Sequence, residues 1–301
     1  MIRRCVTRPC VTLAAASRRR HERPVRRLVL RAARSFGAVL LVGAMVACAA
    51  DPDDSGRGRS PVASVVSIPS ADGPVWLGAP PAAVTVDDGV LASVVAVHAF
   101  GCGPVSHGSG FAVASGLLVG SAHVVAGASS VEIAWNAGGD ELVTASADIV
   151  GFDPERDLVL LRSDAAVPPL RIERVRYGST AAVIGYLQGE RLEVSPARIE
   201  HLVRASGLWG DGIGRNVYFL AADVQKGQSG GPLVDRGGVV GVAFATATGP
   251  DDIGYALSRG ELLGFLASSG VDVGFDYRGD AVIHAQPASF GVTSSGDCRL
   301  R

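Results

Sequence analysis

The chain has 301 residues, of which 48% are hydrophobic, 19% charged and 6% aromatic. This is an ordinary globular composition, and it excludes a chain that is disordered throughout or collagen-like. The net charge of −1 hides an asymmetry, because residues 1–47 contain eleven arginines and one acidic residue, whereas the remainder has a net charge of −11. An acidic body argues against a nucleic-acid partner, since nucleic-acid binding depends on a basic surface.

The first 48 residues have the pattern of an export leader. The basic stretch is followed by an uncharged, largely apolar run over residues 35–50. This run is shorter than the roughly 20 apolar residues of a membrane-spanning helix and ends in small residues, as secretory signals do. It closes with Met-Val-Ala-Cys at 45–48, which resembles a bacterial lipobox. We therefore expect lipidation at Cys48 and residence at the extracytoplasmic face of the membrane or in the periplasm. A plain secretory signal and a retained short anchor are the alternatives.

Cysteine usage agrees with export. Beyond the leader and Cys48, the chain contains two cysteines, Cys102 and Cys298. Two cysteines in an exported protein most simply form one disulfide. Such a bridge would hold the C-terminal tail against the start of the domain, and two free thiols are the alternative. The histidines and cysteines show no metal-ligand spacing, so we expect no metal and no cofactor.

The rest of the chain divides into three parts. Residues 49–87 are rich in Asp, Pro, Ser, Gly and Ala, which is typical of a flexible tether. Residues 88–268 consist mainly of short Val-, Ile- and Leu-rich runs between Gly, Asp and Ser clusters, which predict an all-β barrel or sandwich. Ser258 and Glu261 have the spacing of a capping box and predict a helix over residues 259–269. A tail of residues 270–301 follows, and we see no oligomerisation domain.

The apolar runs define the expected strands. They cover residues 90–97, 110–119, 131–135, 148–150, 158–162, 181–186, 192–194, 197–202, 217–222, 239–246 and 254–257.

A glycine-rich segment provides the strongest chemical signal. It reads Gly-Gln-Ser-Gly-Gly-Pro-Leu at 227–233, so that Ser229 lies between glycines. Glycine allows positive φ and close approach of a substrate to the backbone. The N–H groups of Gly227 and Ser229 could then point at one spot and form an oxyanion hole. Gly-x-Ser-x-Gly alone is a weak signal, because glycine-rich turns are common.

A nucleophilic serine needs a base, and the base needs an acid that orients it. His123 follows an apolar run, within Ala-His-Val-Val-Ala-Gly at 122–127, and Asp157 directly precedes the apolar run Leu-Val-Leu-Leu. Each residue alone is more often structural. Together with Ser229 they stand in the order His, Asp, Ser, each in the setting that a catalytic triad requires.

At these residues the chain resembles the trypsin-like serine proteases, specifically their bacterial HtrA-like branch. The stretches around His123, Asp157 and Ser229 match that branch, as do Gly-Ser-Gly-Phe at 108–111 and Ile-Gly-Tyr-Ala-Leu at 253–257. The resemblance covers roughly residues 88–268. Ala-Asp-Val at 222–224 and the two flanking cysteines are similar to a subgroup of actinobacterial periplasmic acid-resistance proteases.

The resemblance implies a chymotrypsin-like double β-barrel, with barrels over about 88–170 and 171–258. It also implies a serine endopeptidase that acts on proteins or peptides. His123 would be the general base, Asp157 would orient it, Ser229 would be the nucleophile, and the N–H groups of Gly227 and Ser229 would bind the oxyanion. Asp223, six residues before Ser229, would floor a specificity pocket for Arg or Lys; a structural role is the alternative.

The sequence departs from the family pattern at several positions. Gly120 and Ser121 replace the usual Thr-Asn or Thr-Ala before Ala-His, and Gln228 replaces the Asp or Asn common before the nucleophile. An Asp there pairs with a newly cut N-terminus in digestive proteases, so Gln228 argues against that zymogen switch. None of these changes removes a catalytic atom.

Two other functions compete with a protease. An α/β-hydrolase esterase would need a helix after the serine, but Pro-Leu-Val-Asp at 232–235 predicts a strand and then a turn. A chymotrypsin-fold binding module that has lost its activity is the second alternative, although all three residues of the triad are present.

Overall fold

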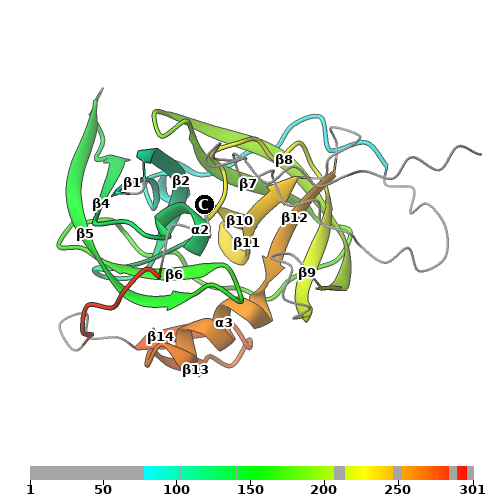
Figure 1. Cartoon of the computed structure of the whole chain (residues 1–301). Helices are drawn as coiled ribbons and strands as arrows, with labels where there is room; N and C mark the ends of the chain where they lie inside the picture. The colour runs from blue at the N-terminus through cyan, green and yellow to red at the C-terminus, as the bar shows by residue number, and fades with distance from the viewer. Residues whose placement is uncertain are drawn as a thin grey trace, which may run out of the picture. The chain divides into compact units, whose positions relative to one another are not determined.

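The computed structural model describes residues 78–101, 103–139, 141–206, 214–246, 253–284 and 290–296. Within these segments, twelve strands form two closed antiparallel barrels of six strands each (Figure 1). This confirms the predicted all-β, chymotrypsin-like double barrel.

The first barrel has the strand order β1-β2-β3-β6-β5-β4, so neighbours in sequence are mostly neighbours in space. β3 pairs with β6 across the barrel seam, which brings the segments after β3 and before β6 together. Its strands are β1 Val94–Gly101, β2 Gly103–Ala114, β3 Leu117–Gly120, β4 Ser130–Asn136, β5 Leu142–Asp153 and β6 Leu158–Arg162.

The second barrel repeats this pattern with the order β10-β11-β12-β9-β8-β7. β10 pairs with both β7 and β11, and it begins at Pro232, within the glycine-rich segment 227–233. Its strands are β7 Thr180–Leu187, β8 Arg191–Ser206, β9 Gly214–Ala221, β10 Pro232–Asp235, β11 Gly238–Thr246 and β12 Ile253–Ser258.

Three short helices and one hairpin complete the described chain. The helices are α1 Asp88–Leu91, α2 Ala122–Val125 and α3 Arg259–Ser268, and the hairpin consists of β13 Asp272–Phe275 and β14 Ala281–His284. Ser258 Oγ accepts a hydrogen bond from the Glu261 N–H at 3.3 Å, which caps α3 as the sequence predicted. In the described part of the chain, no helix has the length and apolarity needed to cross a bilayer.

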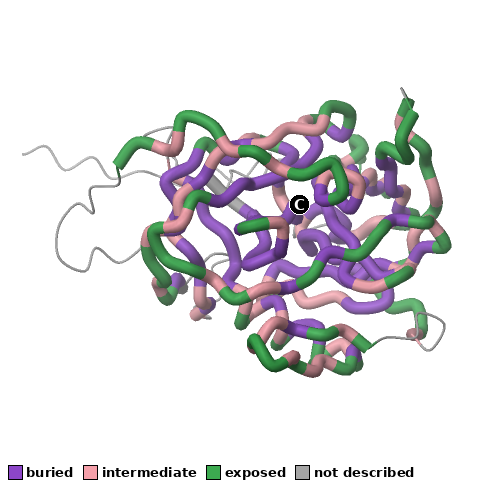
Figure 2. Tube along the Cα trace, turned by 180° about the vertical axis from the view of Figure 1, so that it is seen from behind, coloured by how far each residue is buried: buried purple, intermediate pink, exposed green. Residues whose placement is uncertain are grey.

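Strand alternation explains why the strands are apolar on both faces. In β1, Val95 and Val97 belong to the core cluster inside the first barrel, whereas Val94 and Ala96 belong to a cluster shared with the second barrel. Successive side chains of a strand point to opposite faces, so one run supplies both cores. Figure 2 shows the buried segments gathered in the barrel strands. The shared cluster fixes one barrel against the other through buried apolar surface.

Several predicted strands differ from the structure. The runs 192–194 and 197–202 are parts of one continuous strand, β8. Val90 and Leu91 lie in α1, and β1 begins only at Val94, because a short apolar run fits a helical turn as well as a strand. The run 110–119 is divided between β2 and β3 by a turn at Gly116, whose φ is 74°. Glycine adopts that conformation without strain, so the chain reverses there.

Candidate active site

His123 and Asp157 meet at the seam of the first barrel. His123 lies in α2, just after β3, and Asp157 lies in the turn before β6. The Asp157 carboxylate accepts two hydrogen bonds from His123, one from its backbone N–H at 2.8 Å and one from Nδ1 at 2.8 Å. The backbone of the two segments is also joined, because Ala122 N–H donates to the Asp157 carbonyl at 3.2 Å. Both the position and the ring orientation of His123 are therefore held.

These contacts determine the protonation of the imidazole. A carboxylate only accepts hydrogen bonds, so Nδ1 carries the proton and Nε2 of the neutral ring is an acceptor. Burial alone would lower the pKa of His123, but the charge of Asp157 and its hydrogen bond outweigh burial and raise the pKa above the usual histidine value. Asp157 is only 2% exposed, whereas His123 is 26% exposed. The His123 ring is therefore partly accessible from solvent, and its Nε2 can accept a proton from a group bound there.

Asp157 has an unusual backbone conformation, with φ at 57°. A non-glycine residue with positive φ is uncommon and must be held by its surroundings. The preceding residue contributes to this, because Arg156 N–H donates to Asp153 Oδ1 at 2.8 Å and its guanidinium contacts Asp153 Oδ2 at 2.6 Å. The turn that presents Asp157 is thus closed by an ion pair.

Ser229 lies in the turn that leads into β10. Gly227 and Gly230 have φ of 106° and 86°. A Cβ at Gly227 would lie 2.5 Å from the Tyr186 carbonyl oxygen, so only glycine fits there. A Cβ at Gly230 would lie 2.6 Å from the backbone nitrogen of Ser121, two residues before His123. The serine turn of the second barrel therefore packs directly on the strand end that leads to His123.

Two backbone N–H groups of this turn are available to a ligand. Gln228 N–H donates to the Gln225 carbonyl at 3.0 Å, and Gly230 and Gly231 N–H also have backbone acceptors. Within the described part of the chain, the N–H groups of Gly227 and Ser229 have no protein acceptor. These are the two groups that the sequence predicted for an oxyanion hole.

The Ser229 hydroxyl donates to the Phe244 carbonyl at 3.2 Å. A hydroxyl has one proton and rotates to suit its partners. In this conformation the hydroxyl is directed toward β11. It must rotate away from the Phe244 carbonyl before a base can accept its proton.

Gln228 has a structural role that the sequence did not reveal, although it stood out as a departure from the family pattern. Its side chain is fully buried. Oε1 accepts from Gln225 N–H at 2.8 Å and from the Ser195 hydroxyl at 3.2 Å, and Nε2 donates to the Val183 carbonyl at 3.3 Å. The residue before Ser229 thus ties the serine turn to the second barrel with three neutral hydrogen bonds.

Of the other predicted site residues, the structure describes Asp223 but not the three cysteines. Asp223 is exposed, between β9 and the serine turn, while Val224 beside it is buried in the core of the second barrel. Cys48, Cys102 and Cys298 lie outside the described residues. The described residues contain no group of three or more His, Cys, Asp or Glu side chains that could hold a metal ion.

The sequence of this chain is similar to those of known proteins. The family description "Trypsin-like peptidase domain" matches residues 108–242. The chain is 36% identical over 177 residues to the serine protease Rv3671c of Mycobacterium tuberculosis, an alignment that covers 56% of this chain and 43% of that protein. It is 31% identical over 160 residues to the putative serine protease HhoA of Synechocystis, covering 50% of this chain and 39% of that protein. The chain thus spans less than half the length of these relatives.

Solved structures show the same architecture. The active form of the Rv3671c protease aligns with a TM-score of 0.64 at 31% identity, over 78% of this chain and 99% of that one. The HtrA-type protease AlgW, solved with a tripeptide, aligns with a TM-score of 0.53 at 25% identity, over 62% of this chain and 66% of that one. The likeness to Rv3671c therefore covers that whole solved domain.

Proposed function

This chain belongs to the trypsin-like peptidase family, and from that premise we propose that it is a serine endopeptidase with His123, Asp157 and Ser229 as its catalytic triad. The observation that carries the proposal is the pair of 2.8 Å hydrogen bonds by which the Asp157 carboxylate holds His123. Ser229 supports it, because its glycine turn packs on the strand end before His123. The substrates are proteins or peptides.

The proposed reaction uses each group in turn. Ser229 Oγ bonds to the carbonyl carbon of the scissile peptide while its proton passes to Nε2 of His123. The carbonyl oxygen becomes an oxyanion that accepts hydrogen bonds from Gly227 and Ser229 N–H, each worth about 3 kcal/mol in the transition state. The C–N bond then breaks, His123 returns the proton to the leaving amine, and water hydrolyses the acyl-enzyme by the same steps.

A fluorophosphonate probe tests the proposal, because it bonds to an activated serine. We expect labelling of the wild type, and none of Ser229→Ala or His123→Ala, with both variants folded by circular dichroism. A folded wild type that is neither labelled nor proteolytic would instead support the binding module, the alternative function. Cleavage at the wild-type rate by Ser229→Ala would rule out the triad.

We propose a preference for Arg or Lys before the scissile bond, which rests on Asp223. The carboxylate lies six residues before Ser229 and is exposed, so it is accessible to a substrate cation. Asp223→Ala should lower kcat/KM for peptides with Arg at that position relative to matched peptides with Leu. If the ratio of kcat/KM between the Arg and Leu peptides does not change, Asp223 does not contribute to substrate specificity.

We also propose that the protein is exported and anchored by lipid at Cys48, with residues 49–87 as a tether between the membrane and the protease domain at 88–268. The support is the basic and then apolar pattern of residues 1–48. Mass spectrometry of the native protein should show a lipidated N-terminal Cys48, and Cys48→Ala should release the protein from membranes or block its processing. An unmodified N-terminus elsewhere would contradict lipidation and leave secretion intact.

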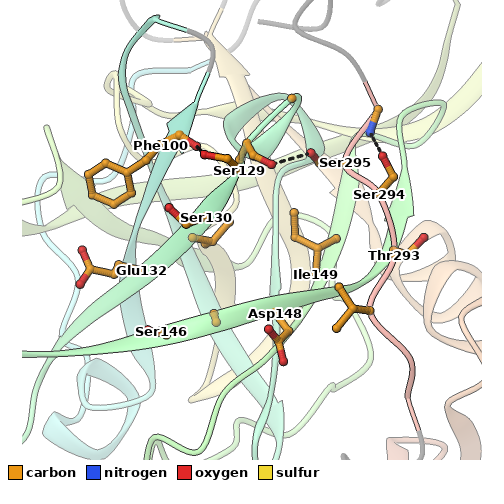
Figure 3. Close-up of a pocket in the computed structure, with 16 residues that line it drawn as sticks. Phe100, Ser129, Ser130, Glu132, Ser146, Asp148, Ile149, Thr293, Ser294 and Ser295 are labelled. Atoms are coloured by element: carbon orange, nitrogen blue, oxygen red, sulfur yellow. Dashed lines mark hydrogen bonds between the residues drawn. The ribbon is translucent and has the colours of Figure 1, made fainter.

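A disulfide between Cys102 and Cys298 is a further proposal, supported by described residues that precede each cysteine in the chain. The tail residue Ser295 bonds to the first barrel, because its carbonyl accepts from Gly127 N–H at 3.3 Å and its hydroxyl donates to the Ala128 carbonyl at 3.3 Å (Figure 3). Ser129, next along the chain, donates to the Phe100 carbonyl through its N–H at 2.8 Å. The tail thus docks beside the end of β1, just before Cys102. Non-reducing peptide mapping should find the two cysteines linked.

A further inference from the structure

Ser109 in β2 is a buried serine whose hydroxyl, among the described residues, bonds to two groups of the other barrel. It is fully buried. Its Oγ donates to the Gly227 carbonyl at 2.7 Å and accepts from Tyr186 N–H at 2.7 Å. These partners are 118 and 77 residues away in the chain, one in the serine turn and one in β7. A single hydroxyl therefore links the first barrel, the second barrel and the serine turn.

The backbone of Ser109 contacts the same turn. Its N–H donates to the Ser229 carbonyl at 2.8 Å, and a Cβ at Gly230 would overlap the Ser109 carbonyl oxygen. On the other side, a Cβ at Gly185 would lie 2.6 Å from Ser109 Oγ. A side chain at 185 would therefore collide with the Ser109 hydroxyl, and one at 230 would collide with its backbone, so both glycines leave the room that Ser109 occupies.

The contacts of Ser109 bear on the orientation of one peptide group. The peptide that joins Gly227 to Gln228 is held at both ends, since its carbonyl accepts from Ser109 Oγ and its N–H donates to the Gln225 carbonyl at 3.0 Å. The N–H groups of Gly227 and Ser229 lie in the peptides directly before and after it. The dihedral angles of Gly227 and Gln228, which set the orientation of the held peptide, also set the direction of the Gly227 N–H relative to the Ser229 N–H.

We propose that Ser109 is a positioning residue for the oxyanion hole, which orients the N–H groups of Gly227 and Ser229 by holding the Gly227 carbonyl. The proposal rests on the proposed protease function. Pre-oriented donors matter most where charge develops in the transition state, so a misplaced donor lowers the rate of the chemical step more than it weakens substrate binding.

The variant Ser109→Ala tests this role. It removes the hydroxyl, leaves the backbone contacts in place and strands the Gly227 carbonyl without its partner. We expect kcat on a fluorogenic peptide that the wild type cleaves to fall by about 10- to 100-fold, as misplacement of a reacting group by about 1 Å does, with KM changed less than threefold. The rate of inactivation by diisopropyl fluorophosphate should fall by a similar factor, because its phosphoryl oxygen uses the same hole.

Ser163 provides a matched control in the first barrel. Its buried hydroxyl also donates to a backbone carbonyl, that of Ser146 at 2.8 Å, and accepts from a backbone N–H, that of Ala165 at 3.3 Å. Ser163→Ala should therefore lower thermal stability as Ser109→Ala does, but keep wild-type kcat and inactivation rate. Equal kinetic effects of the two substitutions would mean that Ser109 acts only through stability, and would overturn the proposal.

The outcomes separate this inference from the proposed function. Wild-type kinetics in a folded Ser109→Ala, with an active wild type and an inactive Ser229→Ala, would overturn the role of Ser109 and leave the triad intact. An inactive wild type would instead refute the proposed function. If Ser109→Ala does not fold, Ser109→Cys carries the same test, since its thiol is a weaker donor; an unchanged kcat and inactivation rate in that variant would count against the proposal.

Discussion

Glu261, in the first turn of α3, accepts a hydrogen bond at 3.2 Å from the guanidinium Nε of Arg156, which lies 105 residues earlier and next to Asp157. In a capping box the Glu side chain bonds back to the N-cap N–H. Here its other oxygen accepts from Asn216 N–H at 2.9 Å. The Glu261 side chain therefore joins α3 to β9 and to the turn that carries Asp157. Its backbone N–H separately donates to Ser258 Oγ and so caps the helix.

We expect Glu261→Gln to lower the free energy of unfolding by at most about 1 kcal/mol, because Arg156 is 37% exposed and exposed ion pairs contribute little. Urea denaturation of the single variants and of the double variant with Arg156→Met measures the coupling. The control is Glu193→Gln, which breaks the more exposed pair with Arg191. A coupling energy no larger than that of the control pair would show that the link to α3 adds nothing.

The contact between Asp157 and His123 predicts a specific pH dependence. His123 must be neutral to act as a base, and its pKa is raised because the charge and hydrogen bond of Asp157 outweigh burial. Activity should therefore be lost as the pH falls through a pKa that lies above the ordinary histidine value. Asp157→Asn removes the raising contacts and keeps the burial, so the acidic limb of kcat/KM should move to lower pH while kcat falls by about 10⁴-fold. A limb that does not move would mean that another group titrates.

Ser121, at the N-cap of α2, has a buried hydroxyl without a hydrogen-bond partner among the described residues. An unpaired buried polar group costs about 1–3 kcal/mol. Ser121→Ala should therefore raise the melting temperature by roughly 2–4 °C, the shift that about 1 kcal/mol produces in a domain of this size. Calorimetry measures it, and a lower melting temperature would show that the hydroxyl is paired in solution.

The proposed disulfide predicts a redox-dependent stability. A bridge between Cys102 and Cys298 would close a loop of nearly 200 residues and stabilise the fold by at most about 5 kcal/mol in the chain-entropy model. Dithiothreitol should therefore lower the melting temperature of the wild type. Cys298→Ser should melt at the reduced wild-type temperature and should not respond to the reductant. Equal melting of oxidised and reduced wild type would contradict the bridge.

The sequence by itself determined the fold class and the residues proposed for catalysis, because these depend on local pattern. Short apolar runs between turn residues predict most of the barrel strands, and the motifs around His123, Asp157 and Ser229 are each contiguous. The same local pattern left the start of β1 wrong, since the run from Val90 fits a helical turn as well as a strand.

Only the tertiary structure decided which groups hold the proposed site in place. In the sequence, Ser109 is one residue of the Gly-Ser-Gly-Phe stretch that matches the protease family, and Gln228 is a departure from the family pattern. Neither observation indicates what the two side chains contact. Their partners lie across the barrel junction or around the serine turn, as with the Gly227 carbonyl 118 residues from Ser109. Such hydrogen bonds depend on how two closed sheets pack and on where glycines leave room, and neither is encoded in the spacing of residues along the chain.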